Sequence, residues 1–470
     1  ALGLLAIAGP PAPAQSTGGT PVFFGPDIRI SGVPSDPAGT THWETCIAAN
    51  PKDAKNLVAG YFDRFPTIDL DQTCSFSVTG DGGQSWTVQG VVPMRDLPGS
   101  SYCVDPSVAA DGRGTFYYAY LDVNLPPTGG EDVDIRVARS TDKGQSFPTS
   151  TAAVHEGPYE YLDKPYLAAD AQPKSRFRGT VYVSYTNFVL HVGTPTGIFV
   201  VVSRDGGGAW SAPVFLDGPA PDGAFPQGSV PVVAPDGTAY VFWARYVDGS
   251  EPMSIRFSKS RDGGRSWSPA ADAASNLPGT GLFYLKNADS KFGANSDRGL
   301  NANSFPTAAI AANGTIFVAW TDFPEGSCKT APRSAVYPSC TNADVRLSVS
   351  RDGGATWTAP VKVTDETNAT DQFFPWMAAH PNGLVSLAWI DRRLDPDNIN
   401  YDAFYTNTFD GASFLPNVRV STATSLLGLA AGIGDYNGIA ATTDAVFPVW
   451  GDLRNQTDVQ AYVARGTLGP

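Results

Sequence analysis

The sequence predicts an all-β fold, a β-propeller of seven four-stranded blades, with six blades as the alternative. Two repeated patterns indicate this: a turn built around an aspartate, found six times, and an apolar run that ends in an aromatic and a polar residue, found seven times. Copies of the turn lie roughly 60 residues apart, which is the length of one blade. The 470 residues also include 49 glycines and 39 prolines, which suits many turns. No segment shows sustained helical periodicity.

The aspartate turn reads Thr79-Gly-Asp81-Gly-Gly-Gln-Ser-Trp86 in its first copy. The aspartates of the six copies are Asp81, Asp142, Asp205, Asp262, Asp352 and, in a degraded copy, Asp410. In a tight turn, Asp and Ser/Thr side chains accept backbone N–H bonds, and glycine permits a positive φ. We therefore expect the aspartates of the intact copies to stabilise the blades and to take no part in chemistry.

The apolar runs predict the second strand of each blade, from residues 56–63 in the first copy to residues 445–452 in the seventh. They are apolar on both faces because a neighbouring blade covers each face. The last copy lacks a fourth strand, and residues 27–31 resemble the outer strands of other blades. We expect this N-terminal strand to close the ring, since closure removes exposed edges. Residues 275–303 and 323–343, within the long step from Asp262 to Asp352, are expected to form surface loops.

The domain organisation follows from these repeats. Residues 1–14 resemble the end of a secretory signal peptide, an apolar run followed by an A-x-A site, and residues 15–26 are an N-terminal extension. Residues 27–470 form a single propeller. The apolar run is too short to span a bilayer. Because the segment resembles a signal peptide, we expect an exported protein that is secreted, periplasmic or at the cell surface. We also expect a monomer. A net charge of -14 argues against nucleic acid and anionic membranes as partners.

The five cysteines fit an oxidising compartment. Cys328 and Cys340 flank a proline-containing loop and are placed to bridge it. Two of Cys46, Cys74 and Cys103 are expected to pair, and the sequence does not choose which; unpaired buried thiols are the alternative.

The aspartate turns resemble the Asp-box, or bacterial neuraminidase repeat, S-x-D-x-G-x-x-W, of the sialidase superfamily. The resemblance covers essentially the whole chain. It implies a propeller whose boxes lie opposite the active site, in a superfamily that includes glycan-active enzymes and non-catalytic proteins. Working sialidases use an arginine triad, a tyrosine nucleophile paired with a glutamate, an aspartate acid/base and an F-R-I-P motif. Here Asp27-Ile-Arg29-Ile-Ser31 lacks the Phe and Pro, so neither the first triad arginine nor a Tyr/Glu pair is carried over.

Strand direction predicts where a site would lie. Strands alternate in direction within a blade, so if the aspartate turns join the third and fourth strands on one face, the second strands end, and the first strands begin, on the other. Ligand sites favour such funnel mouths. The candidate catalytic residues at this mouth are Glu44, Asp63, Arg64, Asp105, Asp163, Arg245, Asp322, Asp391 and Arg392. Other polar residues expected there are His42, Asp122, Asn187, Asp371, Asp435, Asp452 and Arg454.

These residues have two interpretations. Crowded carboxylates raise one another's pKa, which creates an acid/base pair, and an arginine can bind a substrate carboxylate through two hydrogen bonds. Polar residues at strand ends also cap loops or pair with each other, which is a structural role.

A weak calcium pattern lies in residues 395–402, although acid/base chemistry by two carboxylates requires no cofactor. Oxygen-bearing side chains recur in Asp395, Asp397, Asn398, Asn400 and Asp402. The helix–loop frame and the bidentate glutamate of an EF-hand are missing. The four histidines show no zinc-like spacing.

Two functions remain open on the sequence. One is an exported glycoside hydrolase that uses two carboxylates at the funnel, with an arginine holding a glycan. The other is a non-catalytic propeller that binds glycan or protein at the cell envelope. A buried carboxylate with a shifted pKa would favour the enzyme, and a shallow mouth with solvated carboxylates would favour the binding platform.

Overall fold

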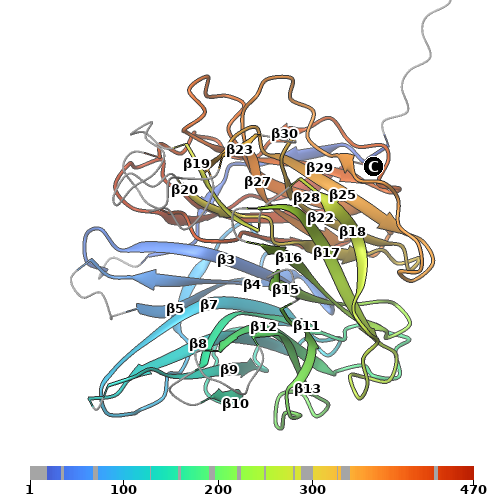
Figure 1. The fold of residues 1–470 in the computed structure, drawn as a ribbon. Helices are drawn as coiled ribbons and strands as arrows, with labels where there is room; N and C mark the ends of the chain where they lie inside the picture. Colours follow the sequence, from blue (N-terminus) through green and yellow to red (C-terminus); the bar gives the residue numbers. More distant parts are fainter. Residues whose placement is uncertain are drawn as a thin grey trace, which may run out of the picture.

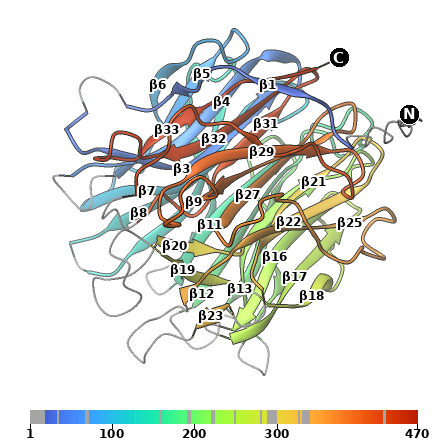
Figure 2. The ribbon, with the colours of Figure 1, turned by 90° about the horizontal axis from the view of Figure 1, so that it is seen from above.

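The computed structural model confirms a seven-bladed β-propeller whose four-stranded sheets follow one another around a common axis (Figures 1 and 2). The structure describes residues 18–32, 36–66, 72–127, 129–156, 160–189, 196–219, 224–247, 250–278, 281–286, 300–324, 327–329, 339–427 and 432–469. The predicted signal segment, residues 1–14, lies outside these residues.

The first three blades are β3 (Thr41–Asn50), β4 (Asp53–Arg64), β5 (Gln72–Thr79) and β6 (Thr87–Val91); β7 (Ser100–Ala110), β8 (Phe116–Leu125), β9 (Asp132–Ser140) and β10 (Ser150–Glu156); and β11 (Glu160–Ala169), β12 (Val181–Val189), β13 (Gly197–Ser203) and β14 (Val214–Asp217). The next three are β15 (Phe225–Val233), β16 (Ala239–Val247), β17 (Ser250–Ser260) and β18 (Ala271–Leu277); β21 (Thr307–Ile310), β22 (Ile316–Asp322), β25 (Asp344–Ser350) and β26 (Val361–Lys362); and β27 (Gln372–Ala379), β28 (Val385–Asp391), β29 (Asp402–Thr408) and β30 (Val418–Arg419). The seventh is β31 (Gly438–Ala441), β32 (Ala445–Asp452), β33 (Gln460–Val463) and β2 (Ile28–Arg29). The first strands contact one another in the order β3, β7, β11, β15, β21, β27, β31 and back to β3, which closes the ring.

Both ends of the chain take part in the seventh blade, as predicted for the N-terminal strand. Ile28 pairs with Val463 across β2 and β33. A second antiparallel pair, β1 (Val22–Phe24) with β34 (Gly466–Leu468), adds to the same sheet. The last blade is therefore held by strands from opposite ends of the sequence, and its fourth position is not left as an open edge.

The long step holds more structure than predicted. Its described part forms a small extra sheet of β19 (Leu282–Leu285), β20 (Leu300–Asn303), β23 (Cys328–Lys329) and β24 (Ser339–Cys340). Phe283, Leu285 and Leu300 have no exposed surface. The expectation of surface loops alone was wrong here, because these few apolar residues pack onto the main core despite the polar composition around them.

Burial follows the predicted two-sided pattern of the second strands. All seven residues of β22 and of β28 are buried, and so are all eight of β32. Trp243, Trp320, Trp389 and Trp450 occupy corresponding places in the second strands of blades four to seven, each at most 2% exposed. These large rings fill the wedge between blades and supply much of the apolar burial that holds the ring together.

The aspartate turns, which resemble the Asp-box, follow the third strand of their blades, as expected. In the first copy, Asp81 Oδ1 accepts hydrogen bonds from the backbone N–H groups of Gln84 (2.9 Å) and Ser85 (3.0 Å). The hydroxyl of Thr79 accepts a bond from Gly83 N (3.0 Å). The hydrogen bond from the Ser85 hydroxyl lowers the pKa of Asp81 to about 2. The hydrogen bonds of this carboxylate thus stabilise its own turn.

The structure shows which of the three N-terminal cysteines form a disulfide. Cys74 and Cys103 form a disulfide that joins the first two blades, with their Cα atoms 5.6 Å apart, while Cys46 is free and buried. Cys340 is disulfide-bonded and lies opposite Cys328 in the β23–β24 pair. Among the described residues there is no helix long and apolar enough to cross a membrane.

Candidate functional site

The first strands of five blades carry the same irregularity. In each, two residues interrupt the pairing with the second strand, and the first of the two has a positive φ. These residues are Glu44 (52°), Asp105 (56°), Lys164 (48°), Gly228 (70°) and Phe374 (54°). Such a bulge redirects a side chain, and a non-glycine residue in this conformation stores strain of order 1 kcal/mol. The fold therefore maintains strain at the same level of blades one, two, three and six, while glycine accommodates the bulge of blade four.

Three of the redirected side chains meet two others near the axis. We call Glu44, Asp105, Asp163, Lys164 and Asp435 the axial cluster. Glu44 and Asp105 lie close together, and each carboxyl group affects the ionisation of the other. Asp105 Oδ2 also accepts a bond from the backbone N–H of Lys164 (2.9 Å). The cluster thus unites residues from blades one, two and three with Asp435, which enters blade seven.

Solvent reaches the cluster only in part. Asp105, Asp163 and Asp435 are half-buried, while Glu44 is 9% exposed. Glu44 Oε2 is buried without a hydrogen-bond partner, whereas Asp163 Oδ2 accepts a bond from Gln227 (2.8 Å). A buried carboxyl oxygen without a hydrogen-bond partner destabilises the folded state. Such an oxygen is typical of a group that binds a ligand or a proton.

Burial and crowding shift the ionisation of every member of the cluster. Burial, reinforced by the charge of Asp105, raises the pKa of Glu44 well above its ordinary value. Burial followed by the charge of Asp163 raises the pKa of Asp105 to about 7, and the same two causes raise the pKa of Asp435 to about 6. Burial also raises the pKa of Asp163. The cluster therefore holds protons at neutral pH and can both donate and accept them.

Lys164 supplies the positive charge. Its Nζ atom lies 4.7 Å from the ring centroid of Tyr436, 4.8 Å from Tyr166, 5.3 Å from Trp376 and 5.8 Å from Phe305. Nζ is buried with no hydrogen-bond partner. Burial lowers the pKa of Lys164 to about 8, against the opposing pull of the carboxylates. Ring faces and carboxylates together replace the water that the ammonium has lost.

The same rings form a floor beneath the cluster. The Tyr166 centroid lies 5.0 Å from Trp376 and 5.9 Å from Tyr436, and the Tyr436 hydroxyl donates to Pro106 O across the axis (2.9 Å). Below the floor, towards the Asp-box side, a cavity of about 310 Å³ is lined by apolar residues of all seven first strands, among them Ile47 and Ala441. That cavity offers no side chain for acid/base chemistry, so a reacting ligand would meet the cluster from the mouth.

The structure brings together three of the nine predicted site residues, Glu44, Asp105 and Asp163. Those at the ends of second strands are engaged elsewhere. Asp63 bonds to His42 Nδ1 (2.5 Å), and Asp391 accepts bonds from Trp389 Nε1 (2.8 Å) and Arg393 Nε (2.9 Å). These contacts fit the structural interpretation, in which the carboxylates brace the strand ends.

The remaining predicted residues also lie apart from the contacts that define the axial cluster. Arg392 is completely buried and pairs with Asp371 (3.3 Å). Asp322 is buried and accepts the Phe323 N–H (2.9 Å), and burial raises the pKa of Asp322 to about 6. Arg64 is exposed at the end of β4, and Arg245 is half-buried on β16.

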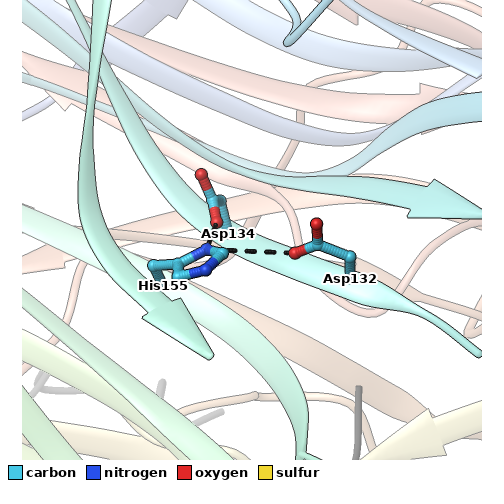
Figure 3. Close-up of side chains that lie close together, drawn as sticks. All are labelled: Asp132, Asp134 and His155. Atoms are coloured by element: carbon cyan, nitrogen blue, oxygen red, sulfur yellow. Dashed lines mark hydrogen bonds and ion pairs between the residues drawn. The ribbon is translucent and has the colours of Figure 1, made fainter. Parts of the chain in front are cut away.

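One group outside the cluster has metal-like proximity among the described residues: Asp132, Asp134 and His155 (Figure 3). His155 Nδ1 lies 2.6 Å from Asp134 Oδ1 and 3.9 Å from Asp132 Oδ1. Arg95 NH1 is 3.1 Å from Asp132 Oδ1 and 3.2 Å from Asp134 Oδ1, and Arg136 NH1 is 3.0 Å from Asp134 Oδ2. Two guanidinium groups already neutralise these carboxylates, so the group is an ion-pair network.

The predicted calcium loop is held by contacts of its own. Asp395 Oδ2 accepts bonds from the backbone N–H of Ile399 and of Asn400, and Asp402 Oδ1 is 2.7 Å from Arg419. Asn398 Nδ2 donates to Asp371. The calcium site stays a prediction, and these contacts assign several of its oxygens to other partners.

Sequence reasoning placed Asp435 at the mouth but missed Lys164 and the aromatic floor. A signal existed: a residue followed by Pro or Thr stands just before the small apolar first strand in Glu44-Thr45, Asp105-Pro106 and Lys164-Pro165. Aligning the blades at that pair would have placed the ammonium beside the two carboxyls.

Comparison with known proteins adds information on the fold. A protein of unknown function from Dyadobacter fermentans superposes with a TM-score of 0.51 at 13% identity, covering 95% of this chain and 99% of that one. A Hadza microbial sialidase gives 0.46 at 16% identity (86% and 75%), and an α-L-arabinofuranosidase from Fusarium graminearum gives 0.45 at 13% identity (80% and 95%). At these identities the likeness concerns the fold alone, and the two values below 0.5 support no argument about this chain.

No family model matches the sequence, and no curated protein matches it. The described part of the chain is thus a seven-bladed propeller with repeated aspartate turns.

Proposed function

We propose that this protein is a glycoside hydrolase whose reaction takes place at the axial cluster. The observation that carries the proposal is the Glu44–Asp105 pair, two neighbouring carboxyl groups from adjacent blades, of which Glu44 Oε2 is buried without a hydrogen-bond partner. Burial raises the pKa of Glu44 well above its ordinary value and the pKa of Asp105 to about 7. Glycoside hydrolysis needs one carboxylic acid that is still protonated at working pH and a second carboxylate that is ionised. A cluster of four carboxyl groups around one ammonium can hold both forms at once.

The roles follow from these pKa shifts. The Glu44–Asp105 pair holds a proton and would give it to the glycosidic oxygen as the bond to the anomeric carbon breaks. Asp163 or Asp435 would act from the other side, either directing a water molecule or attacking the anomeric carbon. Lys164 favours the ionised form of these carboxylates and stabilises the negative charge of the site.

The site favours neutral glycosides over anionic sugars. Four carboxyl groups face one ammonium, so a ligand carboxylate would be repelled. The sialidase arrangement is also incomplete at this position: the cation in contact with the cluster is Lys164, and the Tyr436 hydroxyl is committed to Pro106 with its pKa raised by burial. The Asp-box resemblance supports glycan chemistry in general, and the disulfide between Cys74 and Cys103 supports export.

The test is turnover on a panel of neutral aryl glycosides and aryl sialosides. We expect activity on a neutral glycoside that falls about 10²- to 10⁴-fold in Glu44→Gln and in Asp105→Asn. The matched control is Asp205→Asn, the same change in an Asp-box on the opposite face, which should retain activity. Thermal unfolding of each variant establishes that it is folded.

Two results would contradict the proposal. Equal activity in Glu44→Gln, Asp105→Asn and Asp205→Asn would mean that the axial cluster takes no part in the reaction. No turnover of any substrate by folded wild-type protein would favour the non-catalytic alternative, a propeller that binds glycan or protein at the cell envelope.

A further inference from the structure

Three neighbouring blades carry an aromatic residue at the same position of the first strand, one step further towards the mouth than the axial cluster. The register defines this position. Each aromatic precedes a residue that pairs with the polar end of the second strand: Cys103 with Asp122, Leu162 with Asn187, and Pro226 with Arg245. The three aromatics, which we call the aromatic arc, are Tyr102, Tyr161 and Phe225.

The arc is partly exposed, and two of its rings lie against Phe188. Tyr161 is 45% exposed, while Tyr102 and Phe225 are half-buried. The Tyr161 ring lies 6.3 Å from Phe188, and Phe188 in turn lies 6.3 Å from Phe225. A large ring left open to solvent on a packed aromatic base is a typical contact surface for an apolar ligand face.

The arc also adjoins the carboxyl groups of the cluster. Tyr161 and Asp163 are alternate residues of β11 with no irregularity between them, so their side chains leave the strand on the same side. Partial burial is the first cause of the raised pKa of Tyr161, and the charge of Asp163 is the second. Asp105 contributes to the raised pKa of Tyr102. Ring faces and hydrogen-bonding carboxyl groups therefore lie side by side.

Other blades do not repeat this arrangement. At the corresponding position blade one has Thr41, which precedes the His42–Asp63 pair, and blade six has Asp371, which precedes the Gln372–Asp391 pair. The apolar surface is thus limited to the side of the mouth formed by blades two to four, which gives a bound chain a direction.

We propose that the aromatic arc is a sugar-binding subsite, on which a ring of a neutral oligosaccharide stacks next to the unit that the axial cluster acts on. The chemistry favours this occupant because a sugar ring has an apolar C–H face for the aromatic rings and hydroxyl edges for the carboxyl groups. A purely apolar ligand would cover Asp105 and Asp163 without adding a hydrogen bond to either, and an anionic ligand would be repelled by them. The subsite deepens the proposed function, since it names the substrate as an oligosaccharide.

The experiment compares Tyr161→Ala with Tyr161→Phe. The probes are soluble neutral hexasaccharides of glucose, arabinose and N-acetylglucosamine, with binding measured by calorimetry on the full chain. We expect one probe whose Kd rises about tenfold in Tyr161→Ala and stays near the wild-type value in Tyr161→Phe, because the ring face and not the hydroxyl makes the contact. The control is Phe409→Ala, an equally exposed ring (45%) in the Asp-box turn of the opposite face.

Kinetics separates this inference from the proposed function. For a turned-over oligosaccharide, Tyr161→Ala should raise KM, whereas Phe409→Ala should leave KM and kcat unchanged. Tyr161-dependent binding without turnover would retain the subsite and reject the hydrolase. Binding by no probe, or an unchanged Kd in Tyr161→Ala, would overturn the subsite whatever the activity.

Discussion

The two faces of this propeller use the same residue type in opposite ways. On one face the Asp-box aspartates lie near the surface, and hydrogen bonds from hydroxyl and backbone N–H groups lower the pKa of Asp81 to about 2 and the pKa of Asp352 to about 2. At the axial cluster, burial and neighbouring charge raise the pKa of Asp105 to about 7. Hydrogen-bond donors around a carboxylate lower its pKa and keep it ionised. Burial raises the pKa of a carboxyl group, so that it can hold a proton near neutral pH.

The two faces also differ in how their side chains repeat. The Asp-box contacts recur in blade after blade with nearly the same geometry, as expected of a structural device multiplied by duplication. The axial cluster uses one backbone device, the bulge with positive φ, but fills it with Glu44, Asp105, Lys164, Gly228 and Phe374 in different blades. The backbone device is therefore repeated, whereas the side chain that it redirects differs from blade to blade.

The largest effect we expect concerns the counter-charge of the cluster. Lys164→Met keeps an apolar chain among the rings but leaves four carboxyl groups without their ammonium. At pH 8, where Asp105 (pKa about 7) and Asp435 (pKa about 6) are mostly ionised and Lys164 (pKa about 8) is still partly charged, this should lower the free energy of unfolding by about 3 kcal/mol, with a much smaller loss at pH 5. Urea unfolding at both pH values measures it.

The control for this change is Lys143→Met on the Asp-box face. Lys143 is exposed and pairs with Asp53 (2.9 Å), so its loss should cost less than about 1 kcal/mol at either pH. A Lys164→Met protein as stable as wild type at pH 8 would mean that the cluster does not depend on the ammonium.

A smaller effect of opposite sign is expected for Asp105→Asn. The folded-state pKa of Asp105, about 7, lies above the ordinary value of 3.8, so its stabilising contribution is full below pH 4 and is lost as pH rises through 7. The neutral amide removes that loss. Asp105→Asn should therefore be about 2 kcal/mol more stable than wild type at pH 8, with no gain at pH 4. If the free energy of unfolding of the two proteins changed in parallel between pH 4 and pH 8, Asp105 would not have the raised pKa of a buried carboxyl group.

The smallest effect concerns an Asp-box. Asp81→Asn weakens charge-assisted bonds from Ser85 and the turn backbone and should cost about 1 kcal/mol at neutral pH. Because the folded-state pKa of Asp81 is depressed, its contribution is present above the ordinary pKa and disappears as pH falls towards 2. Guanidinium unfolding at pH 7 and pH 2.5 checks both statements. A loss of activity in this variant, if folded, would contradict the division between the two faces.

The architecture could be predicted from the chain alone. A period of about 60 residues, strands apolar on both sides and an orphan N-terminal strand were enough to predict seven blades and their closure. Alternating strand direction then placed Glu44, Asp105, Asp163 and Asp435 at one mouth, because direction depends only on the order of strands within each blade. These features are local or periodic, so they are visible in the amino-acid sequence.

Which polar residues of the mouth meet became visible only in the folded structure. Asp391 and Asp63 look like Asp105 in the sequence, yet the first two are bound by Arg393 and His42 within their own blades. The axial cluster and its floor are assembled from bulges and rings of different blades, and the pKa shifts come from burial by residues distant in sequence. Contacts between blades depend on three-dimensional packing, and no local pattern in the chain encodes which side chains will share the axis.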